Sequence, residues 1–465
     1  MSARWPPEPR VSIPGAGQSY WSPEEPMDPE ERAPLVLAKL RAQVRYAWER
    51  SPFYRRLWSQ AKVEPQQLRT LADLARFPLV TKDDLRADQE KFPPFGSNLC
   101  CGPEAIARVH GTSGTSGRPT LFAISRDDWA RIGAAHARIM WSFGMRPSDT
   151  VFVGSFFSLY LGSWGALAGA EALGARTIPF GAGAPGQSER ALELLELLRP
   201  TAFYGTPSYA LHLARIARGF GRDPAQLGLR VMFFSGEPGA GTPATKRRIE
   251  KTFGAYCIDT GSMAEMTPWM TNAECAERTG MHLWEDIVYT EIVDPETREP
   301  LESDGRGVPV YTHLERTSQP MIRLFSGDLT RVTSDPCACG RTYPRLPDGI
   351  YGRIDDMLIV RGTNVYPHVI AEALSRVAGI GSEHRIVVER PDELDVLTIE
   401  IEASDADVAA SVSDEVRHAI GLRPVVKVHP PDTLPTTEFK SRRIIDRRPS
   451  GQPRAMTLAT ARREP

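Results

Sequence analysis

The chain has 465 residues, 41% of them apolar and 25% charged, which is enough for two or three domains with a sizeable core. Its 56 basic and 58 acidic side chains nearly balance, so the net charge of -2 gives no electrostatic reason to expect nucleic acid or an anionic membrane as a partner. The N-terminus is rich in proline and charge, and no apolar run is long enough to cross a membrane. These features predict a soluble, cytoplasmic protein.

The first predicted domain begins with about thirty proline-rich residues that we expect to be irregular. Helices are predicted over 33–57 and 65–76. From residue 148 to 260, short apolar runs typical of buried parallel strands alternate with helical segments. The strands are expected at 150–153, 175–178, 201–204, 231–234 and 255–258, and the helices at 189–198, 207–218 and 243–253. This alternation indicates a wound α/β sheet with ligand-binding loops at the carboxyl ends of its strands.

The pattern changes after residue 259 to turn-rich β structure, with strands expected at 287–293 and 308–312. A second unit then follows the order strand, helix, strand, strand, helix, strand. Its strands are expected at 357–360, 384–389, 395–401 and 425–428, and its helices at 367–376 and 407–419. This βαββαβ order predicts a small, ferredoxin-like α+β domain. We therefore expect a large α/β domain with a β-rich subdomain (1–354), a small C-terminal domain (355–449) and a disordered tail (450–465).

One loop, residues 110–120, points to function and reads His-Gly-Thr-Ser-Gly-Thr-Ser-Gly-Arg-Pro-Thr. Its glycines let backbone N–H groups turn toward an anion, and its hydroxyls add donors that follow phosphate oxygens. It is neither a Walker A sequence nor the Gly-x-Gly-x-x-Gly of a dinucleotide fold. A flexible linker is the alternative, but the strand-like residues 121–124 follow at once. The sequence therefore predicts a phosphate-binding loop inside a folded domain.

Six cysteines occur in the chain, and a disulfide framework is not expected in a cytosolic protein of this size. Cys337 and Cys339 form a short knuckle, and Cys275 and His282 lie upstream, seven residues apart. Together these four residues predict a tetrahedral zinc site. Its role would be structural, because four protein ligands leave no open position. Four unrelated buried residues are the alternative.

Three of the predicted strand ends carry unusual residues, namely Tyr204-Gly205, Ser235-Gly236-Glu237-Pro238 and Gly261-Ser262-Met263-Ala264-Glu265. With the 110–120 loop, Asp328, the Asp355-Asp356 pair and Lys440, they form an ordered set that resembles the adenylate-forming superfamily of acyl-CoA synthetases, adenylation domains and luciferases. Within it, the chain is most similar to phenylacetate-CoA ligases and related aryl-CoA ligases. The likeness runs from residues 77–86 to Lys440. Its most specific stretch, residues 352–367, reads Gly-Arg-Ile-Asp-Asp-Met-Leu-Ile-Val-Arg-Gly-Thr-Asn-Val-Tyr-Pro.

The resemblance implies an ATP-dependent aryl-CoA ligase with two half-reactions. A carboxylate attacks the α-phosphate of ATP to give an acyl-adenylate and pyrophosphate, and CoA then displaces AMP. Lys440 is the implied catalytic cation, Glu265 the ligand of Mg²⁺, and Arg353 the support of the ribose ligand Asp328. The implied ATP-binding residues are Thr112, Ser113, Gly114, Thr115, Ser116 and Gly117 for the triphosphate, Ser235, Gly236, Glu237 and Pro238 for the adenine, and also Asp259, Ser262, Met263 and Asp328.

The resemblance also implies that the small domain rotates about Asp355 between the two half-reactions. That rotation withdraws Lys440 and brings in the loop from Arg361 to Tyr366, where Gly362 lets the pantetheine of CoA pass close to the backbone.

Three departures from the family pattern stand out. Gly261–Glu265 replaces the usual Tyr-Gly-x-Ser/Thr-Glu, so the adenine-stacking aromatic and the hydroxyl beside magnesium are missing. Arg118 replaces a common lysine. Phe325 replaces a basic residue often found shortly before the ribose aspartate.

The acid-binding segments are rich in aromatic residues, which suits a benzoate, anthranilate or arylacetate ring. The residues expected to face the acid are Phe156, Phe157, Tyr160, Trp164, Tyr204, Gly205, Met263 and Ala264. The absence of lysine and arginine from these segments disfavours a dicarboxylate. Two alternatives stay open: an adenylating ligase that passes the acyl group to a carrier protein or an amine, and a nucleotide-binding homologue without catalysis. The oligomeric state is also open, with a homodimer as one option.

Overall fold

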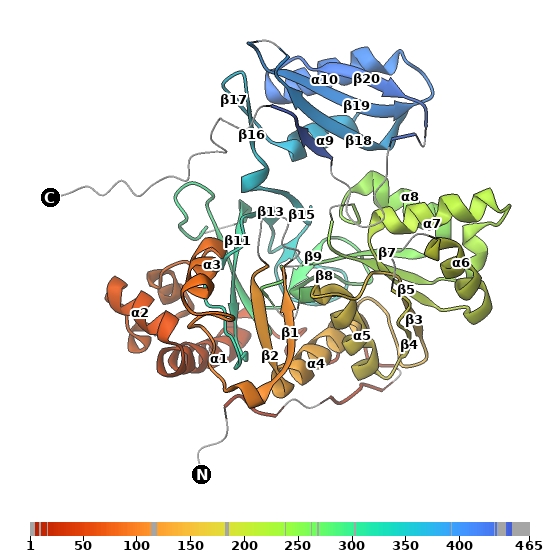
Figure 1. Ribbon diagram of the computed structural model, residues 1–465. Helices are drawn as coiled ribbons and strands as arrows, with labels where there is room; N and C mark the ends of the chain where they lie inside the picture. The colour runs from red at the N-terminus through yellow and green to blue at the C-terminus, as the bar shows by residue number, and fades with distance from the viewer. Residues whose placement is uncertain are drawn as a thin grey trace. The chain divides into compact units, whose positions relative to one another are not determined.

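The computed structural model describes residues 5–8, 11–15, 17–112, 119–181, 186–237, 239–261, 263–266, 269–301, 304–391, 393–431, 433–434 and 443–448. The chain divides into two compact units, Met1–Ile350 and Tyr351–Pro465 (Figure 1). Among the described residues, no helix is both long enough and apolar enough to cross a membrane.

The first unit begins with an irregular segment that leads into a group of N-terminal helices. These are α1 (Pro29–Arg50), α2 (Pro52–Ala61), the 3₁₀ turns η1 (Pro65–Gln67) and η2 (Leu71–Arg76), and α3 (Lys82–Lys91). The helix predicted over 33–57 is therefore two helices. Ser51 separates them, because it ends α1 and its hydroxyl caps α2 by accepting the N–H of Tyr54. Pro52 at the first position of α2 favours the same break.

The centre of the first unit is an eight-stranded sheet of order β14-β9-β8-β7-β6-β5-β3-β4. Its parallel strands are β3 (Thr150–Val153), β4 (Arg176–Ile178), β5 (Ala202–Gly205), β6 (Val231–Phe234) and β7 (Tyr256–Gly261). Antiparallel strands β8 (Asn272–Glu274), β9 (Met281–Leu283) and β14 (Arg345–Leu346) extend one edge. All five predicted parallel strands are confirmed.

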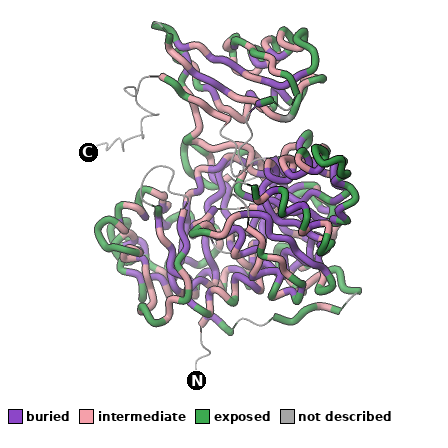
Figure 2. The backbone as a smooth tube through the Cα atoms, turned by 45° about the vertical axis from the view of Figure 1, so that its right-hand side comes forward, coloured by how far each residue is buried: buried purple, intermediate pink, exposed green. Residues whose placement is uncertain are grey.

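Helices cover both faces of this sheet (Figure 1), namely α4 (Arg126–Ser142), α5 (Leu161–Leu173), α6 (Gln187–Leu198), α7 (Pro207–Gly219) and α8 (Pro243–Phe253). Successive residues of β3 point to opposite faces. Val151 and Val153 pack with α4 and α5, whereas Phe152 packs with α6, α7 and α8. Figure 2 shows the result as buried strands inside and exposed backbone on the outer helices. Short 3₁₀ turns lie at η3 (Pro103–Ala105), η4 (Pro224–Leu227) and η5 (Trp269–Thr271).

Two smaller β structures complete this unit. The strands β1 (Ile106–Gly111) and β2 (Leu121–Ser125) form an antiparallel hairpin. A second sheet contains β10 (Val288–Val293), β11 (Gly305–His313), β12 (Leu324–Phe325) and β13 (Asp328–Val332). The turn-rich β structure predicted after residue 259 is confirmed. Strand β15 (Ile350–Arg353) carries the chain across the division between the two units.

The second unit contains the predicted strands and helices in the predicted order, together with two strands that the sequence did not predict. After η6 (Ile354–Asp356) come β16 (Leu358–Val360), β17 (Thr363–Val365), α9 (Pro367–Ser375), β18 (Ile380–Glu389), β19 (Val396–Ala403), α10 (Val408–Ile420), β20 (Val425–His429) and β21 (Ile444–Asp446). The sheet order is β20-β19-β18-β21. The first predicted strand, now β16, pairs instead with β17 in a hairpin, and β21 takes the fourth place in the sheet.

Candidate active site

The base of the predicted phosphate loop is closed by paired hydrogen bonds between the ends of β1 and β2. Thr112 donates its N–H to the carbonyl of Thr120 at 3.1 Å, and its hydroxyl accepts the N–H of Thr120 at 3.1 Å. Beside it, the N–H of Gly111 and Nδ1 of His110 both bond to the carbonyl of Leu159. Burial lowers the pKa of His110 to about 4, so this ring is neutral. These bonds tie the base of the predicted phosphate loop to the segment that precedes Tyr160.

Three hydroxyls predicted to lie in the site converge at the carboxyl ends of β5 and β6. Ser235 Oγ lies 2.7 Å from the hydroxyl of Tyr204 and 3.2 Å from that of Tyr160. Burial raises the pKa of both tyrosines, so they stay protonated. A Cβ at position 162 would collide with both tyrosine hydroxyls, so Gly162 is needed for their approach. We call Tyr160, Tyr204 and Ser235 the hydroxyl cluster.

The predicted aromatic residues do not all join this cluster. The ring of Phe156 stacks on Tyr160 with centroids 5.7 Å apart. Trp164 instead meets Phe157 edge-on at 4.8 Å, and the guanidinium of Arg108 lies 5.0 Å from its ring centroid.

Around Asp259, at the end of β7, the structure groups four charged and small residues. Its N–H donates to Glu274 at 2.8 Å, and Glu274 is paired with Lys246 at 2.6 Å. A Cβ at Gly241 or Gly349 would lie within 3 Å of the Asp259 carboxylate. Burial first, and then the Glu274 carboxylate, raise the pKa of Asp259 to about 8. Asp259 is therefore mainly protonated at neutral pH and is able to donate a hydrogen bond.

Other predicted nucleotide residues have different surroundings. Glu237 accepts the N–H of Ser208 at 2.7 Å, in the first turn of α7. Met263 is buried in a core cluster with the N-terminal helices, whereas Ala264 is only half-buried. Asp328 begins β13, is 7% exposed, and donates its N–H to Ser326 at 3.1 Å.

Glu265, the predicted ligand of magnesium, is a buried carboxylate. Glu265 is 3% exposed, and neither of its carboxylate oxygens has a hydrogen-bond partner among the described residues. Its ionic partner is Lys82 at the start of α3, with Nζ 3.7 Å from Oε1. Buried carboxylates normally accept several hydrogen bonds. The unused oxygens therefore fit a hard cation as the missing partner.

The second unit holds the predicted hinge and CoA-loop residues. Arg353 donates to both carboxylate oxygens of Asp355, at 2.7 and 3.0 Å. Arg361 donates Nε to the carbonyl of Asp395 at 2.6 Å. Gly362 has φ +77°, and a Cβ there would meet no atom of the described residues within 4 Å. The turn between β16 and β17 therefore has open space beside Gly362. Tyr366 precedes α9.

The four predicted zinc ligands come together in the first unit. Their ligand atoms all lie within 4.8 Å of one another. The sulfurs of Cys275 and Cys337 are 3.8 Å apart, and Sγ of Cys339 is 3.4 Å from Nε2 of His282. A tetrahedral zinc with Zn–S bonds of about 2.3 Å separates two sulfurs by about 3.8 Å. Nδ1 of His282 faces the carbonyl of Tyr343, which leaves Nε2 for a metal.

The residues after this knuckle hold the N-terminal segment. Arg341 donates to the fully buried Glu25 at 2.8 Å, and Glu25 also accepts from Arg138 at 3.0 Å. Arg138 in turn pairs with Asp286 at 2.6 Å. The N-terminal segment, predicted to be irregular, is therefore anchored by a buried network of ion pairs next to the knuckle.

Several predicted site residues lie outside the described part of the chain, namely Ser113, Gly114, Thr115, Ser116, Gly117, Pro238, Ser262 and Lys440. Sequence reasoning assigned no role to Lys82, Leu159 or Glu274. The sequence could have drawn attention to Lys82, because it is one of only eight lysines and lies in the 77–86 stretch where the family resemblance begins. Leu159 contributes only its backbone carbonyl to the hydrogen bonds with Gly111 and His110, so its side-chain type could not have indicated the contact.

The chain is an AMP-binding enzyme by class, because the model of that family matches residues 28–309. The model of the AMP-binding enzyme C-terminal domain matches residues 362–448. Phenylacetate-coenzyme A ligase of Thermus thermophilus is 35% identical over 454 residues, covering 92% of this chain and 99% of that protein. The same enzyme of Escherichia coli is 33% identical, covering 92% and 97%. The chain belongs to the phenylacetate-coenzyme A ligase family of AMP-binding enzymes.

A solved structure of a related enzyme is similar over nearly the whole chain. 2-Hydroxyisobutyryl-CoA ligase in complex with 2-HIB-AMP is 50% identical, with a TM-score of 0.88 and 94% of each chain covered. The predicted resemblance and the two-domain α/β fold are thus confirmed. The protein is an adenylate-forming CoA ligase that uses ATP and CoA.

Proposed function

We propose that this CoA ligase activates a small carboxylic acid whose acyl group carries a hydroxyl, through an acyl-adenylate. The observation that carries the proposal is the hydroxyl cluster, two of whose members, Tyr160 and Tyr204, are residues that the family resemblance expects to face the acid. A hydroxyl both donates and accepts hydrogen bonds, so the cluster makes this strand end polar rather than apolar. A substrate hydroxyl buried there gains partners, whereas on an apolar wall it loses them.

The solved structure at 50% identity supports this proposal, because it holds 2-HIB-AMP, the adenylate of a 2-hydroxy acid. The aromatic acid expected from the sequence is the second candidate. The stacking of Phe156 on Tyr160 favours it, as do the relatives named phenylacetate-coenzyme A ligase.

An acid panel distinguishes the two candidates. Purified protein with ATP, Mg²⁺ and CoA is given 2-hydroxyisobutyrate, its matched analogue isobutyrate, phenylacetate, benzoate or anthranilate, and products are identified by mass spectrometry. We expect kcat/KM for 2-hydroxyisobutyrate to exceed that for isobutyrate by about 10⁴-fold, because a site built for a hydroxyl rejects the analogue that lacks it. Tyr204→Phe is expected to reduce that ratio, and Tyr209→Phe, a buried tyrosine on α7 outside the cluster, to leave it unchanged.

Preference for phenylacetate or benzoate would overturn the hydroxy-acid proposal in favour of the aromatic acid. An acyl-AMP that accumulates without a thioester would indicate a carrier protein or an amine as acceptor. Absence of AMP with every acid would indicate the homologue without catalysis.

We propose nucleotide roles for individual residues on the basis of the family resemblance. Thr112 and the loop after it would bind the triphosphate, Asp328 the ribose, and Glu265 a magnesium ion. When bound, magnesium neutralises phosphate charge as the leaving group forms. We also propose that Asp355 is the hinge of the second domain and that the open turn at Gly362 admits CoA.

A structural zinc is proposed at Cys275, His282, Cys337 and Cys339, on the tetrahedral spacing of their ligand atoms. It would join the ends of β8 and β9 to the knuckle. Cys275 follows Glu274, whose carboxylate accepts the N–H of Asp259, so the zinc would also steady the edge of the sheet next to the nucleotide site.

A further inference from the structure

Lys82 has a single ionic partner among the described residues, the buried carboxylate of Glu265. The distance from Nζ to Oε1 is 3.7 Å, longer than the 2.7–2.9 Å, roughly, of a charge-assisted hydrogen bond. Lys82 therefore compensates the charge of Glu265 without using up the lone pairs of its oxygens. The lysine side chain is 29% exposed and that of the glutamate 2%, so the cation lies on the more accessible side of the pair.

The backbone around Lys82 is fixed from both directions. Val80 donates its N–H to Arg323 at 2.9 Å and accepts the N–H of Phe325 at 2.8 Å. Thr81 then starts α3 with a capping box, because its hydroxyl accepts the N–H of Asp84 and the Asp84 carboxylate accepts the N–H of Thr81. Lys82, the first residue of α3, thus lies on a rigid corner of the backbone, residues 80–84.

The other charges on this corner do not compete for Lys82. The carboxylate of Asp83 is 85% exposed and pairs with Arg86 at 3.3 Å. Asp84 is exposed, and its carboxylate is used in the capping box. Among the described residues, Glu265 is therefore the carboxylate that pairs with Lys82.

We propose that Lys82 is a positioning residue for the nucleotide: it holds the Glu265 carboxylate in place for the magnesium of Mg·ATP. The inference rests on the proposed magnesium site. It accounts for two observations together, the unused oxygens of Glu265 and the long, single contact from a lysine held at a rigid helix start. Lys82 acts through Glu265 and is not assigned a contact with the reacting atoms.

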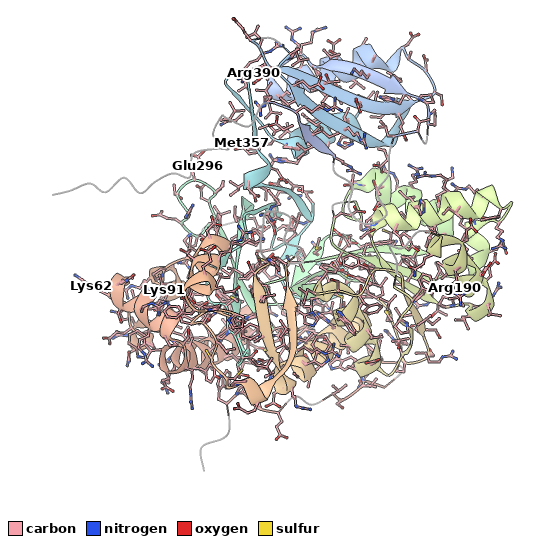
Figure 3. All side chains as sticks on the ribbon, viewed as in Figure 1. Lys62, Lys91, Arg190, Glu296, Met357 and Arg390 are labelled. Carbon is pink, nitrogen blue, oxygen red and sulfur yellow. The ribbon has the colours of Figure 1, made fainter. Side chains whose placement is uncertain are left out.

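The test measures binding without acid or CoA, so it does not depend on the proposed substrate. Isothermal titration calorimetry with Mg²⁺ and α,β-methylene-ATP is expected to show about tenfold weaker binding for Lys82→Met than for the unaltered protein. Binding of AMP, which lacks the β- and γ-phosphates, is expected to change less than about twofold. Lys82→Arg, which keeps the charge, is expected to restore most of the affinity. Lys91→Met is the matched control, because Lys91 is an exposed lysine on the same helix (Figure 3).

A double-mutant cycle tests the route of the effect. In a Glu265→Gln background, Lys82→Met is expected to add less than about a twofold loss, because the partner through which it acts is gone. Full additivity would overturn the proposal, as would unchanged Mg·nucleotide binding or an equal loss for AMP, which would mean a purely structural role. If Lys82→Met does not fold, the uncharged Lys82→Gln takes its place. Magnesium-independent binding by the unaltered protein would overturn the magnesium site itself, whichever acid is the substrate.

Discussion

Lys440→Ala is expected to lower the rate of acyl-adenylate formation by about 10²- to 10³-fold, the usual loss on removing a charge that stabilises a transition state. The role follows from the family resemblance, because Lys440 lies in residues 435–442, outside the described part of the chain. In the first half-reaction negative charge develops at the α-phosphate, and a cation there stabilises it. The measurement is the single-turnover rate of acyl-AMP formation, with acid and ATP and without CoA.

The second half-reaction supplies the internal control. With chemically prepared acyl-AMP and CoA, Lys440→Ala is expected to form thioester at close to the unaltered rate, because the domain rotation that the family resemblance implies would withdraw the lysine in that step. Lys427→Ala, an exposed lysine on β20 in the same unit, is the matched variant and should leave both rates intact. Equal loss of both half-reactions would remove Lys440 from the proposed role.

The largest effect on stability is expected at the zinc site. Purified protein should contain about one zinc per chain, and Cys337→Ser should lose it. Loss of the metal is expected to lower the free energy of unfolding by about 4 kcal/mol or more. The zinc would join β8, β9 and the 337–341 knuckle, and the knuckle anchors Glu25 through Arg341. The measurements are metal analysis by mass spectrometry and thermal unfolding with and without a chelator.

Cys101→Ser is the control for this series, because Cys101 is a free, partly buried cysteine outside the ligand group. It should keep the zinc and the unfolding temperature. A metal-free protein that unfolds at the same temperature with and without added zinc would contradict the zinc proposal.

The sequence predicted the parallel sheet well because its strands are apolar runs buried on both faces, as at Val231–Phe234. It did not predict α4 and α5, where glycines lower helix propensity and blur the periodic pattern. The same glycines serve packing: a Cβ at Gly169 would lie 2.5 Å from Cβ of His136, so its absence lets α5 approach α4. The place of β21 in the sheet depends on its pairing with β18, far earlier in the chain, and local patterns do not encode such a pairing.

In the candidate site, too, local motifs predicted some features, whereas contacts between distant residues were not predicted. Motif spacing indicated the strand-end residues and the four zinc ligands, and the structure brings the hydroxyl cluster and the zinc group each together. The pair of Lys82 with Glu265 joins residues 183 positions apart, and no local pattern specifies such a contact. The expected aromatic residues form two contacting pairs, Phe156 with Tyr160 and Phe157 with Trp164, and only the first of these pairs includes a member of the hydroxyl cluster.

Acid-dependent exchange of labelled pyrophosphate into ATP, measured on the unaltered protein with Mg²⁺ and without CoA, tests the central claim most directly. Exchange requires reversible formation of an acyl-adenylate, so it reports the first half-reaction whatever the acceptor. We predict exchange with 2-hydroxyisobutyrate and little with isobutyrate, and its near-complete loss in Glu265→Gln. Exchange that is absent with every acid, or that persists unchanged in Glu265→Gln, would contradict the account of this site.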